Sequence, residues 1–374
     1  MTQLLFGLQS KVASIISLLQ QRHHPTPYLL KSFFNMKRLQ GVLLYPSPYL
    51  FSSTENVLIP KIGTGKRSTL DLLLEIRFPF LAEFQYQTAG QLVDDAEVFI
   101  FSCTSRVYAN FNDEVVTVWG ANNVKLLNNG QEMQLSLTKE SGSLIRSKQT
   151  FLSGSFTMFM KLVQGDSAGT IASFYLTSLS NNHDEIDMEF LGNSLGQPYL
   201  LHTNIFIQGV GNREQQFSLW FNPTADFHNY TILWNPWQIL FLIDGIPIRV
   251  YGNHEEAGVP YVKKAMKVDS SLYNGETWAT QRGRIKVDWS RAPFVAFLSN
   301  FKAAACKNNT QTNQCSSRSN PDYWWNQPAF HSLSFEQQQL LKSVRKSHLK
   351  YDYCQDKHLF KNDQPAPECA FEII

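Results

Sequence analysis

The segment NNHDEIDMEFLGN, residues 181–193, alternates acidic and large apolar side chains through its centre. Three carboxylic acids fill every second position: Glu185, Asp187 and Glu189. Three large apolar residues fill the alternate positions: Ile186, Met188 and Phe190. Because successive side chains of an extended strand point to opposite faces, this pattern predicts a β-strand with one face in the core and one acidic face.

The spacing of the two glutamates indicates a catalytic pair. Glu185 and Glu189 are four residues apart, which separates their Cα atoms by about 13 Å in a strand. If both side chains lean together, their carboxyls approach to roughly 5–6 Å, close to the separation of about 5–5.5 Å in retaining glycosidases. Like charges this close raise the pKa of at least one carboxyl, so the segment predicts one proton donor and one nucleophile. The alternatives are a solvated acidic strand face and a calcium site built from carboxylates.

From residue 111 onward, short segments alternate or run apolar between Gly, Asn, Pro and Asp turn residues. The segments are residues 132–140, 154–163, 170–179, 184–192, 215–222, 230–235, 239–251 and 292–301. Many short strands at this spacing predict an all-β sandwich. One helix is expected near the C-terminus, where Ser334 and Gln337 form a capping box ahead of residues 336–346.

The composition of the chain narrows the classes of ligand. The 374 residues carry a formal net charge of +2 and no run of lysine or arginine, which argues against nucleic acid. No run of about 18 apolar residues occurs, so we expect no membrane span. Aromatic residues make up 13% of the chain, which fits an all-β core and stacking surfaces for sugars. Small molecules or neutral polymers are the expected ligands, and a monomer is the expected state.

The first hundred residues do not share the β pattern. Apolar residues recur at helical spacing over residues 4–19, but Lys11 interrupts them and no basic stretch precedes them, so this is a poor signal peptide. Residues 20–100 predict helix fragments and loops of low order. The tripeptide Val-Tyr-Ala at 107–109 resembles the cleavage site of a secretory leader that has lost its beginning. Our hypothesis is that a leader once ended at Ala109 and that a foreign or misassembled start precedes it.

The cysteines favour disulfides over zinc. Four of the five cysteines fall near the C-terminus, at gaps wider than those of zinc sites: Cys306, Cys315, Cys354 and Cys369. Cys103 stands alone far upstream. Two local disulfides and the N-x-T sequons at Asn229 and Asn308 are typical of a secretory route.

The segment HDEIDMEFLGN, residues 183–193, resembles the signature of the plant xyloglucan endotransglucosylase/hydrolases of glycoside hydrolase family sixteen, which usually have Phe in place of Met188. The resemblance covers the chain from residue 111 to the C-terminus. It continues through residues 147–178, 201–236, 243–251, 278–301, 344–360 and 367–369.

This resemblance implies a concanavalin-like β-sandwich, or jelly roll, of two curved antiparallel sheets with a short α-helical, disulfide-linked C-terminal extension. We expect an atypical N-terminal segment at 1–109 that is not part of the catalytic fold. The catalytic domain is expected at 110–300 and the extension at 301–374. The implied disulfide pairs are Cys306 with Cys315 and Cys354 with Cys369.

The resemblance also assigns roles to residues. Glu185 matches the family nucleophile, Glu189 the general acid/base and Asp187 the carboxylate between them that assists the pair. The positions that match sugar-contacting residues are His202, Thr203, Asn204, Asn212, Arg213, Glu214, Trp278, Ala279, Gly283 and Arg345. One further aromatic residue resembles a side chain that lines the cleft, Tyr175.

Structural roles remain open for some of these positions. Tyr175 lies inside an apolar segment and fits a core position as well as the cleft. Arg213 and Glu214 fit a surface ion pair, and Arg345 fits a cap at the C-terminal end of its helix. Trp278 precedes a polar turn, which favours an exposed stacking position over burial.

The sequence departs from the family pattern in several places. The family usually has glycine where Arg282 stands, in a loop beside the cleft, and often tryptophan where Tyr273 stands. A glycosylation sequon often follows the catalytic strand, but residues 193–195 lack the required Ser or Thr. Asn229 lies in a predicted strand, so Asn308 is the expected glycan site.

The function that the resemblance implies is that of a secreted enzyme of the plant cell wall, or apoplast. It would cleave the β-1,4-glucan backbone of xyloglucan by a retaining mechanism and transfer the chain to another xyloglucan or to water. Its partners would be a xyloglucan donor and a xyloglucan acceptor, with neither a metal nor an organic cofactor. The alternatives are a mainly hydrolytic enzyme on xyloglucan or mixed-linkage glucan, and a noncatalytic glucan-binding protein.

Overall fold

The structure is a computed structural model that describes residues 85–88, 99–102, 110–308, 323–360 and 364–371. The chain forms two compact units, Met1–Arg106 and Val107–Ile374. In the first unit, β1 (Gln85–Thr88) pairs antiparallel with β2 (Phe99–Ser102). This pair differs from the helix fragments and loops expected there. The remaining expectations for residues 1–84 and for the cleavage-like tripeptide 107–109 lie outside the described residues.

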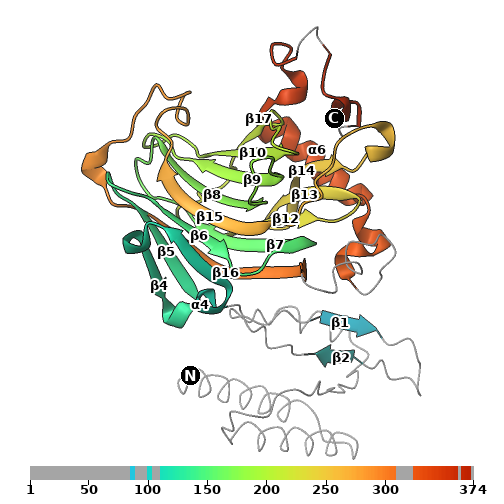
Figure 1. Ribbon diagram of the computed structural model, residues 1–374, viewed down its shortest axis with the longest axis horizontal. Helices are drawn as coiled ribbons and strands as arrows, with labels where there is room; N and C mark the ends of the chain where they lie inside the picture. The colour runs from blue at the N-terminus through green and yellow to red at the C-terminus, as the bar shows by residue number, and fades with distance from the viewer. Residues whose placement is uncertain (1–84, 89–98, 103–109, 309–322, 361–363, 372–374) are drawn as a thin grey trace, which may run out of the picture. The chain divides into compact units, whose positions relative to one another are not determined.

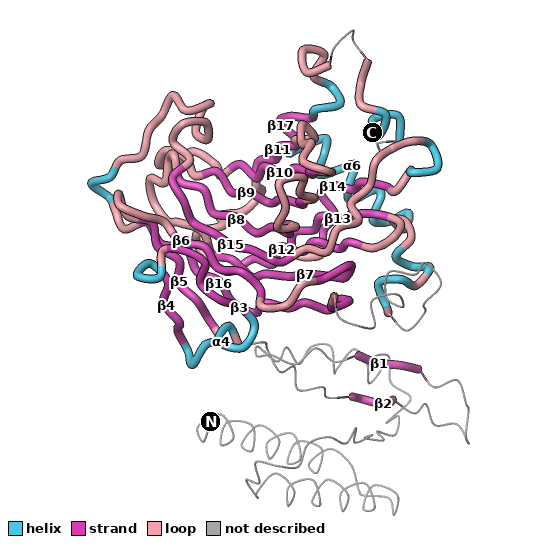
Figure 2. Tube along the Cα trace, viewed as in Figure 1, coloured by secondary structure: helices cyan, strands magenta, loops and turns pink. Residues whose placement is uncertain are grey.

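The second unit contains two antiparallel sheets, which Figures 1 and 2 show as curved layers. The eight-stranded sheet has the order β17 (Leu349–Asp352), β11 (Gln215–Ser218), β10 (Leu200–Phe206), β9 (Glu185–Leu191), β8 (Thr170–Thr177), β15 (Lys267–Asn274), β6 (Ser143–Ser147) and β3 (Val115–Trp119). The seven-stranded sheet has the order β14 (Ile246–Gly252), β13 (Gln238–Ile243), β12 (His228–Trp234), β7 (Phe151–Lys161), β16 (Phe294–Lys307), β5 (Glu132–Leu137) and β4 (Val124–Leu127). The expected concanavalin-like sandwich is confirmed.

The helical elements are short apart from one. They are α4 (Phe111–Glu114), α6 (Phe335–His348) and the 3₁₀ turns η1 (Ala121–Asn123), η2 (Asn128–Gly130), η3 (Glu255–Ala257), η4 (Trp289–Arg291), η5 (Trp324–Asn326), η6 (Pro328–Phe330), η7 (Tyr353–Gln355) and η9 (Pro367–Phe371). No helix in the part of the chain that the structure describes is long and apolar enough to cross a membrane.

The core lies between the two sheets and is built by the alternation of β9. Ile186, Met188 and Phe190 are fully buried in the main hydrophobic cluster. The ring of Phe190 meets that of Tyr230 from β12 edge to face, with centroids 4.5 Å apart, so the two sheets touch directly below the acidic segment. The buried apolar side chains of β9 therefore fix the position of this strand in the sandwich.

A buried arginine bonds the two sheets together near one edge. Arg249 of β14 is fully buried, and its Nη1 donates to the carbonyl oxygen of Thr203 in β10 at 3.0 Å. Its Nη2 donates to the carbonyl oxygen of Arg213 at 2.6 Å. Because β14 belongs to the seven-stranded sheet and β10 to the eight-stranded sheet, these hydrogen bonds fix one layer against the other.

The C-terminal extension contains the expected helix and adds a strand. Ser334 and Gln337 form the predicted capping box at the start of α6. Leu341 and Val344 are the buried residues of this helix, which packs against β14. The chain then continues into β17, which pairs with β11 at the edge of the eight-stranded sheet. The extension is thus integrated into the sandwich.

Candidate active site

The acidic side chains of β9 form a row, the acid row, that consists of Glu185, Asp187 and Glu189. They alternate with the buried apolar residues of the strand, as predicted, so the three carboxyls share the face opposite the core. β9 lies between β8 and β10 inside the eight-stranded sheet. The acid row therefore has a neighbouring strand on each side.

The register of β8, β9 and β10 sets the neighbours of each acid. Across the sheet the aligned sets are Thr177, Glu185 and Phe206; Tyr175, Asp187 and Asn204; and Ser173, Glu189 and His202. Aligned residues of adjacent strands point to the same face. Tyr175, Asn204 and His202 therefore lie on the face of the acid row.

The pKa of the central carboxyl of the acid row is raised well above its usual value. Asp187 is 6% exposed, and burial raises its pKa well above the usual value, with further increases from the charges of Glu185 and Glu189. A hydrogen bond between the Asp187 and Glu185 carboxyls stabilises the protonated form of Asp187. Burial also raises the pKa of Glu185, but the bonds from Thr177 and Asp187 and the nearby His183 oppose that change. The proton of the pair therefore resides on Asp187, and Glu185 is the more ionised partner.

Glu189 has a different environment from the other two acids. Burial raises its pKa, the charges of Glu185 and Glu214 raise it further, and a hydrogen bond from Tyr273 lowers it. The Tyr273 hydroxyl donates to Oε1 of Glu189 at 2.6 Å. A carboxyl with a raised pKa and one oxygen already bonded is suited to give and take a proton at its other oxygen.

An aromatic pair lies beside Glu189. The rings of His202 and Trp278 meet edge to face with centroids 5.8 Å apart. Burial and the charge of Arg249 lower the pKa of His202 to about 4, so its ring is neutral at neutral pH. Trp278 is 38% exposed, in agreement with the expected exposed position. Together these rings give the site an uncharged surface on which a sugar can stack.

On the other side of β9, Tyr175 lies near an ion pair between Arg146 and Asp269. Burial raises the pKa of Tyr175, and so do the charges of Asp269, Glu185 and Asp187. Asp269 of β15 is fully buried and accepts three hydrogen bonds from Arg146, the two shortest from Nη2 to Oδ2 at 2.6 Å and from Nε to Oδ1 at 2.8 Å. Tyr175 thus faces the carboxyls, as the cleft role requires, and its hydroxyl remains protonated.

The triplet at 202–204 divides between the two faces of β10. Asn204 accepts from the backbone N–H of Arg213 at 3.1 Å and donates to Glu214 at 3.4 Å, which holds the following loop over the sheet. Thr203 points inward, is fully buried and bonds to Arg249 at 2.9 Å. The structure therefore brings Asn204 and Glu214 to the acid face and places Thr203 in the core.

The triplet at 212–214 divides in the same way. Asn212 has a left-handed backbone with φ of 62° and lies between β11 and the turn that the Ile207–Val210 bridge closes. The Arg213 side chain is 9% exposed and pairs with Glu368 at 2.5 Å, so the alternative of a surface ion pair with Glu214 is wrong. Its Nη1 also donates to the carbonyl oxygen of Val210 at 2.8 Å. The guanidinium of Arg213 is thus occupied inside the protein.

The loop after β15 carries the next group of predicted residues. Ala279 is buried in a small apolar cluster with Ile171 and Leu191. Gly283 has φ of 77°, and a Cβ there would lie 2.2 Å from the carbonyl oxygen of Thr277, so only glycine fits. Ala279 and Gly283 therefore shape the loop that presents Trp278.

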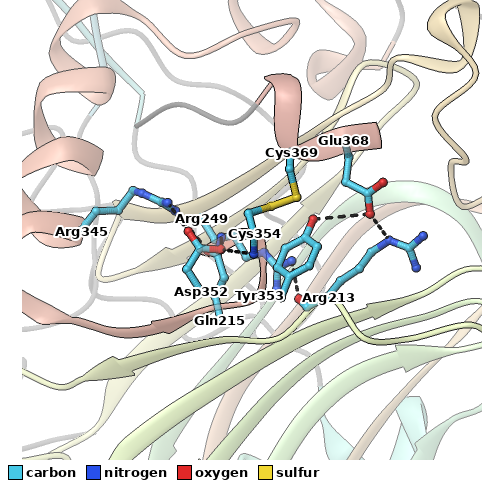
Figure 3. The surroundings of a disulfide bond; sticks show 9 residues. All are labelled: Arg213, Gln215, Arg249, Arg345, Asp352, Tyr353, Cys354, Glu368 and Cys369. Carbon is cyan, nitrogen blue, oxygen red and sulfur yellow. Dashed lines mark hydrogen bonds and ion pairs between the residues drawn. A yellow bond between two sulfur atoms is a disulfide. The ribbon is translucent and has the colours of Figure 1, made fainter. Parts of the chain in front are cut away.

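Arg345 takes part in a polar network under the extension (Figure 3). Its Nη2 donates to Asp352 at 2.7 Å and its Nη1 to the side chain of Gln215 at 3.2 Å. Gln215 and Asp352 are also bonded to each other at 3.3 Å. These bonds join α6 to β11 and β17, a different arrangement from a cap on the end of the helix.

The expected disulfide between Cys354 and Cys369 is present, with the two Cα atoms 5.5 Å apart (Figure 3). Cys306 is also disulfide-bonded. Its expected partner Cys315 lies outside the described residues, as does Cys103. Asn308 is exposed, and its backbone N–H donates to the carbonyl oxygen of Thr150 at 2.7 Å.

The side chains of the site were also compared with the arrangements that bind metal ions. Among the residues for which the structure gives positions, no group of three or more His, Cys, Asp or Glu side chains is arranged to hold a metal ion. The acid row instead forms hydrogen bonds with Thr177, Tyr273 and within itself.

Two residues of the site were not among the predicted site residues. Thr177 bonds Glu185 from the neighbouring strand, and Tyr273 reaches Glu189 from β15, two strands away. The register of β8 against β9 would have identified Thr177. Tyr273 carried only one signal, a tyrosine at a position where the resembled family often has tryptophan.

Comparison with known proteins agrees with this geometry. Residues 111–291 match the model of glycosyl hydrolases family 16, and residues 319–369 match that of the xyloglucan endo-transglycosylase C-terminus. The probable xyloglucan endotransglucosylase/hydrolase protein 10 of Arabidopsis thaliana is 47% identical over 262 residues, which cover 70% of this chain and 87% of the relative. Xyloglucan endotransglucosylase protein 7 of Diospyros kaki is 48% identical over 263 residues, which cover 70% of this chain and 97% of the relative. This chain belongs to the xyloglucan endotransglucosylase/hydrolase family within glycosyl hydrolases family 16.

Proposed function

We propose that this chain cleaves the β-1,4-glucan backbone of xyloglucan with retention and transfers the cleaved chain to a second xyloglucan or to water. The observation that carries the proposal is the placement of three carboxyls on one face of β9, with different surroundings for each. Burial raises the pKa of Asp187 well above its usual value, while Glu189 has a raised pKa and accepts a hydrogen bond from Tyr273. Two carboxyls that differ in environment on one strand face can divide the tasks of nucleophile and proton carrier.

In the first step, Glu185 attacks the anomeric carbon while Glu189 gives its proton to the departing glycosidic oxygen. The carbon–oxygen bond breaks, the reducing-end part of the chain leaves with the proton, and a glycosyl ester forms on Glu185. The hydrogen bond from Asp187 keeps Glu185 ionised and fixes its orientation before the attack.

In the second step, the now ionised Glu189 removes a proton from an incoming hydroxyl, and that oxygen attacks the anomeric carbon. The ester bond to Glu185 breaks and Glu185 leaves as a carboxylate, which restores both glutamates to their starting state. A sugar hydroxyl gives a new xyloglucan chain, whereas water gives hydrolysis. The exposed Trp278 and the neutral His202 beside Glu189 support acceptor binding, because an uncharged aromatic surface favours a sugar ring over water.

We infer further that the protein is secreted and acts in the plant cell wall. The disulfide between Cys354 and Cys369 and the disulfide-bonded Cys306 support an oxidising compartment. The exposed Asn308 supports a glycan at its sequon. Enzymatic removal of N-glycans from cell-wall extracts, followed by mass spectrometry, is expected to find Asn308 converted to Asp; recovery of only unmodified intracellular protein would contradict this.

One assay tests the activity. The full chain with its disulfides intact is incubated with xyloglucan and a fluorescent xyloglucan oligosaccharide, with mixed-linkage glucan in parallel. Transfer is expected to move the label into high-mass xyloglucan, and Glu189→Gln should abolish that movement. Release of reducing ends without labelled polymer would identify a hydrolase, and the absence of both products would overturn the proposal.

A further inference from the structure

Tyr273 is held at the end of the acid row by a small apolar cluster. Its ring packs against the cluster that contains Ile171, Leu191 and Ala279. The strand register explains the placement, because Tyr273 of β15 pairs with Ile171 of β8, which pairs with Leu191 of β9. The ring is therefore positioned by packing.

The hydroxyl of this ring crosses β8 to reach the acid row. It donates to Oε1 of Glu189 at 2.6 Å. The β8 residue aligned with Glu189 is Ser173, a small side chain whose own hydroxyl is bonded to that of Ser271 at 2.6 Å. The small residue at 173 leaves space for the tyrosine to extend diagonally between the strands.

Tyr273 acts as the donor in this bond across the working pH range. Burial raises the pKa of the tyrosine hydroxyl above its ordinary value, and the charge of Glu189 raises it further. The phenol therefore keeps its proton. A donor fixed on one oxygen stabilises the ionised form of Glu189, whose pKa burial otherwise raises.

We propose that Tyr273 is a positioning residue for proton transfer, which occupies Oε1 of Glu189 so that Oε2 carries the proton in both steps. The inference rests on the proposed function, since it assigns the proton carrier of that reaction. In the first step the Oε2 proton moves to the glycosidic oxygen, and in the second step Oε2 receives the proton of the acceptor hydroxyl. Tyr273 keeps its own proton throughout.

The pH profile of kcat/KM tests this role. The first step requires protonated Glu189, so the alkaline limb of the profile reports the pKa of that carboxyl in the free enzyme. Tyr273→Phe keeps the ring and removes the donor. Its alkaline limb should lie roughly 1–2 pH units higher than in the wild type, since a hydrogen bond to a charged group is lost. A limb that stays at the wild-type pH overturns the proposal.

A matched variant separates this role from packing. Ile171→Val trims the fully buried partner of the Tyr273 ring and leaves the hydroxyl in place. It should lower the melting temperature without moving the alkaline limb. If Ile171→Val moves the limb as far as Tyr273→Phe does, the effect comes from packing and the proposal fails.

A measurement without turnover separates this inference from the proposed function. The chain is labelled with ¹³C at its glutamate carboxyls, and the Glu189 signal is assigned by its loss in Glu189→Gln. In Tyr273→Phe this carboxyl should titrate at a higher pH than in the wild type, whether or not xyloglucan is a substrate. Identical titrations overturn the role of Tyr273. A shifted titration in a chain that transfers no xyloglucan supports that role and counts against the proposed function.

Discussion

The acid row and the C-terminal extension bury charge in opposite ways. In the described part of the extension, two buried carboxylates have cationic partners: Glu368 pairs with Arg213 and Asp352 pairs with Arg345. In the acid row, Asp187 has two further carboxyls as its electrostatic neighbours. Opposite charges that meet in the interior remain ionised, whereas like charges must take up a proton.

This difference separates the parts of the molecule that hold the fold from the part that can move protons. A buried ion pair resists any change in protonation, because loss of either charge leaves the other unpaired. A group of carboxyls exchanges protons readily, because the pKa of each depends on the state of the others. Substitutions in the two regions should therefore affect different quantities.

Glu185→Gln is the most severe test of the comparison. Transfer activity should fall roughly 10⁴-fold or more, because the proposed nucleophile is removed. The free energy of unfolding should stay equal or rise, because one of the like charges around Asp187 is gone. Assays of transfer and urea unfolding check both parts, with Glu132→Gln on β5 of the other sheet as the control. A large loss of stability in Glu185→Gln would show that the acid row supports the fold.

Arg213→Met tests the buried ion pair of the C-terminal extension. It leaves the carboxylate of Glu368, whose side chain is 3% exposed, without its partner, and should cost about 3–5 kcal/mol of stability. The exposed pair of Arg291 and Asp288 provides the control, since its side chains are 50% and 49% exposed. Arg291→Met should cost less than about 1 kcal/mol in the same urea experiment. Equal losses would contradict the assignment of a structural role to the buried pair.

The pH dependence of stability sharpens the comparison. Burial and neighbouring charges raise the pKa of Asp187 in the folded state above that in the unfolded state. The folded state therefore binds more protons between those two values, and the free energy of unfolding falls as the pH rises through that interval. Asp187→Asn keeps a donor toward Glu185 without a charge, so its stability should fall less over the same range. Parallel curves of unfolding free energy against pH would refute the proton on Asp187.

Arg282→Gly is expected to have the smallest effect. The loop beside the acid row stores backbone strain at Arg282, which is exposed and has φ of 59°. Glycine removes that strain but gains freedom in the unfolded chain, so we expect a net stabilisation of about 0.5 kcal/mol. The control is Gly283→Ala, which should destabilise because its Cβ would meet the Thr277 carbonyl oxygen. A destabilised Arg282→Gly variant would mean that the arginine side chain contributes more than the strain costs.

The sequence predicts the sandwich well where strands carry apolar residues on alternate positions. The segment around Met188 and the segments that became β7, β12 and β13 are such cases. The predicted segment 239–251 contains Asp244 and Gly245, and in the structure these two residues form the hairpin turn between β13 and β14. The strands β10 and β15 were not among the predicted segments, because polar residues such as His202 and Ser271 on their outward faces weaken the apolar signal.

The acid row could be predicted because its geometry is local to one strand. The partners of Arg213 and Arg345 could not, because nothing near either residue in the sequence marks the partner. Glu368 lies 155 residues from Arg213 along the chain, and the contact depends on how the extension folds back. The inward direction of Thr203 follows from the register of β10, and that strand was itself not predicted. Alternation within one strand is enough to predict the acid row. The ion pairs between residues that are distant in the sequence can be found only from the folded structure.

The hydrogen bonds from Arg249 to Thr203 and Arg213 have a consequence for how the sandwich opens. Separation of the layers at that edge would expose a guanidinium and two carbonyl groups at once, so unfolding there requires a concerted rupture. Amide protons of β10 should then exchange with deuterium only through global unfolding, whereas those of β3, at the far edge of the same sheet, should exchange through smaller local excursions. The slowly exchanging part of the eight-stranded sheet would then include the strand that pairs with the acid row.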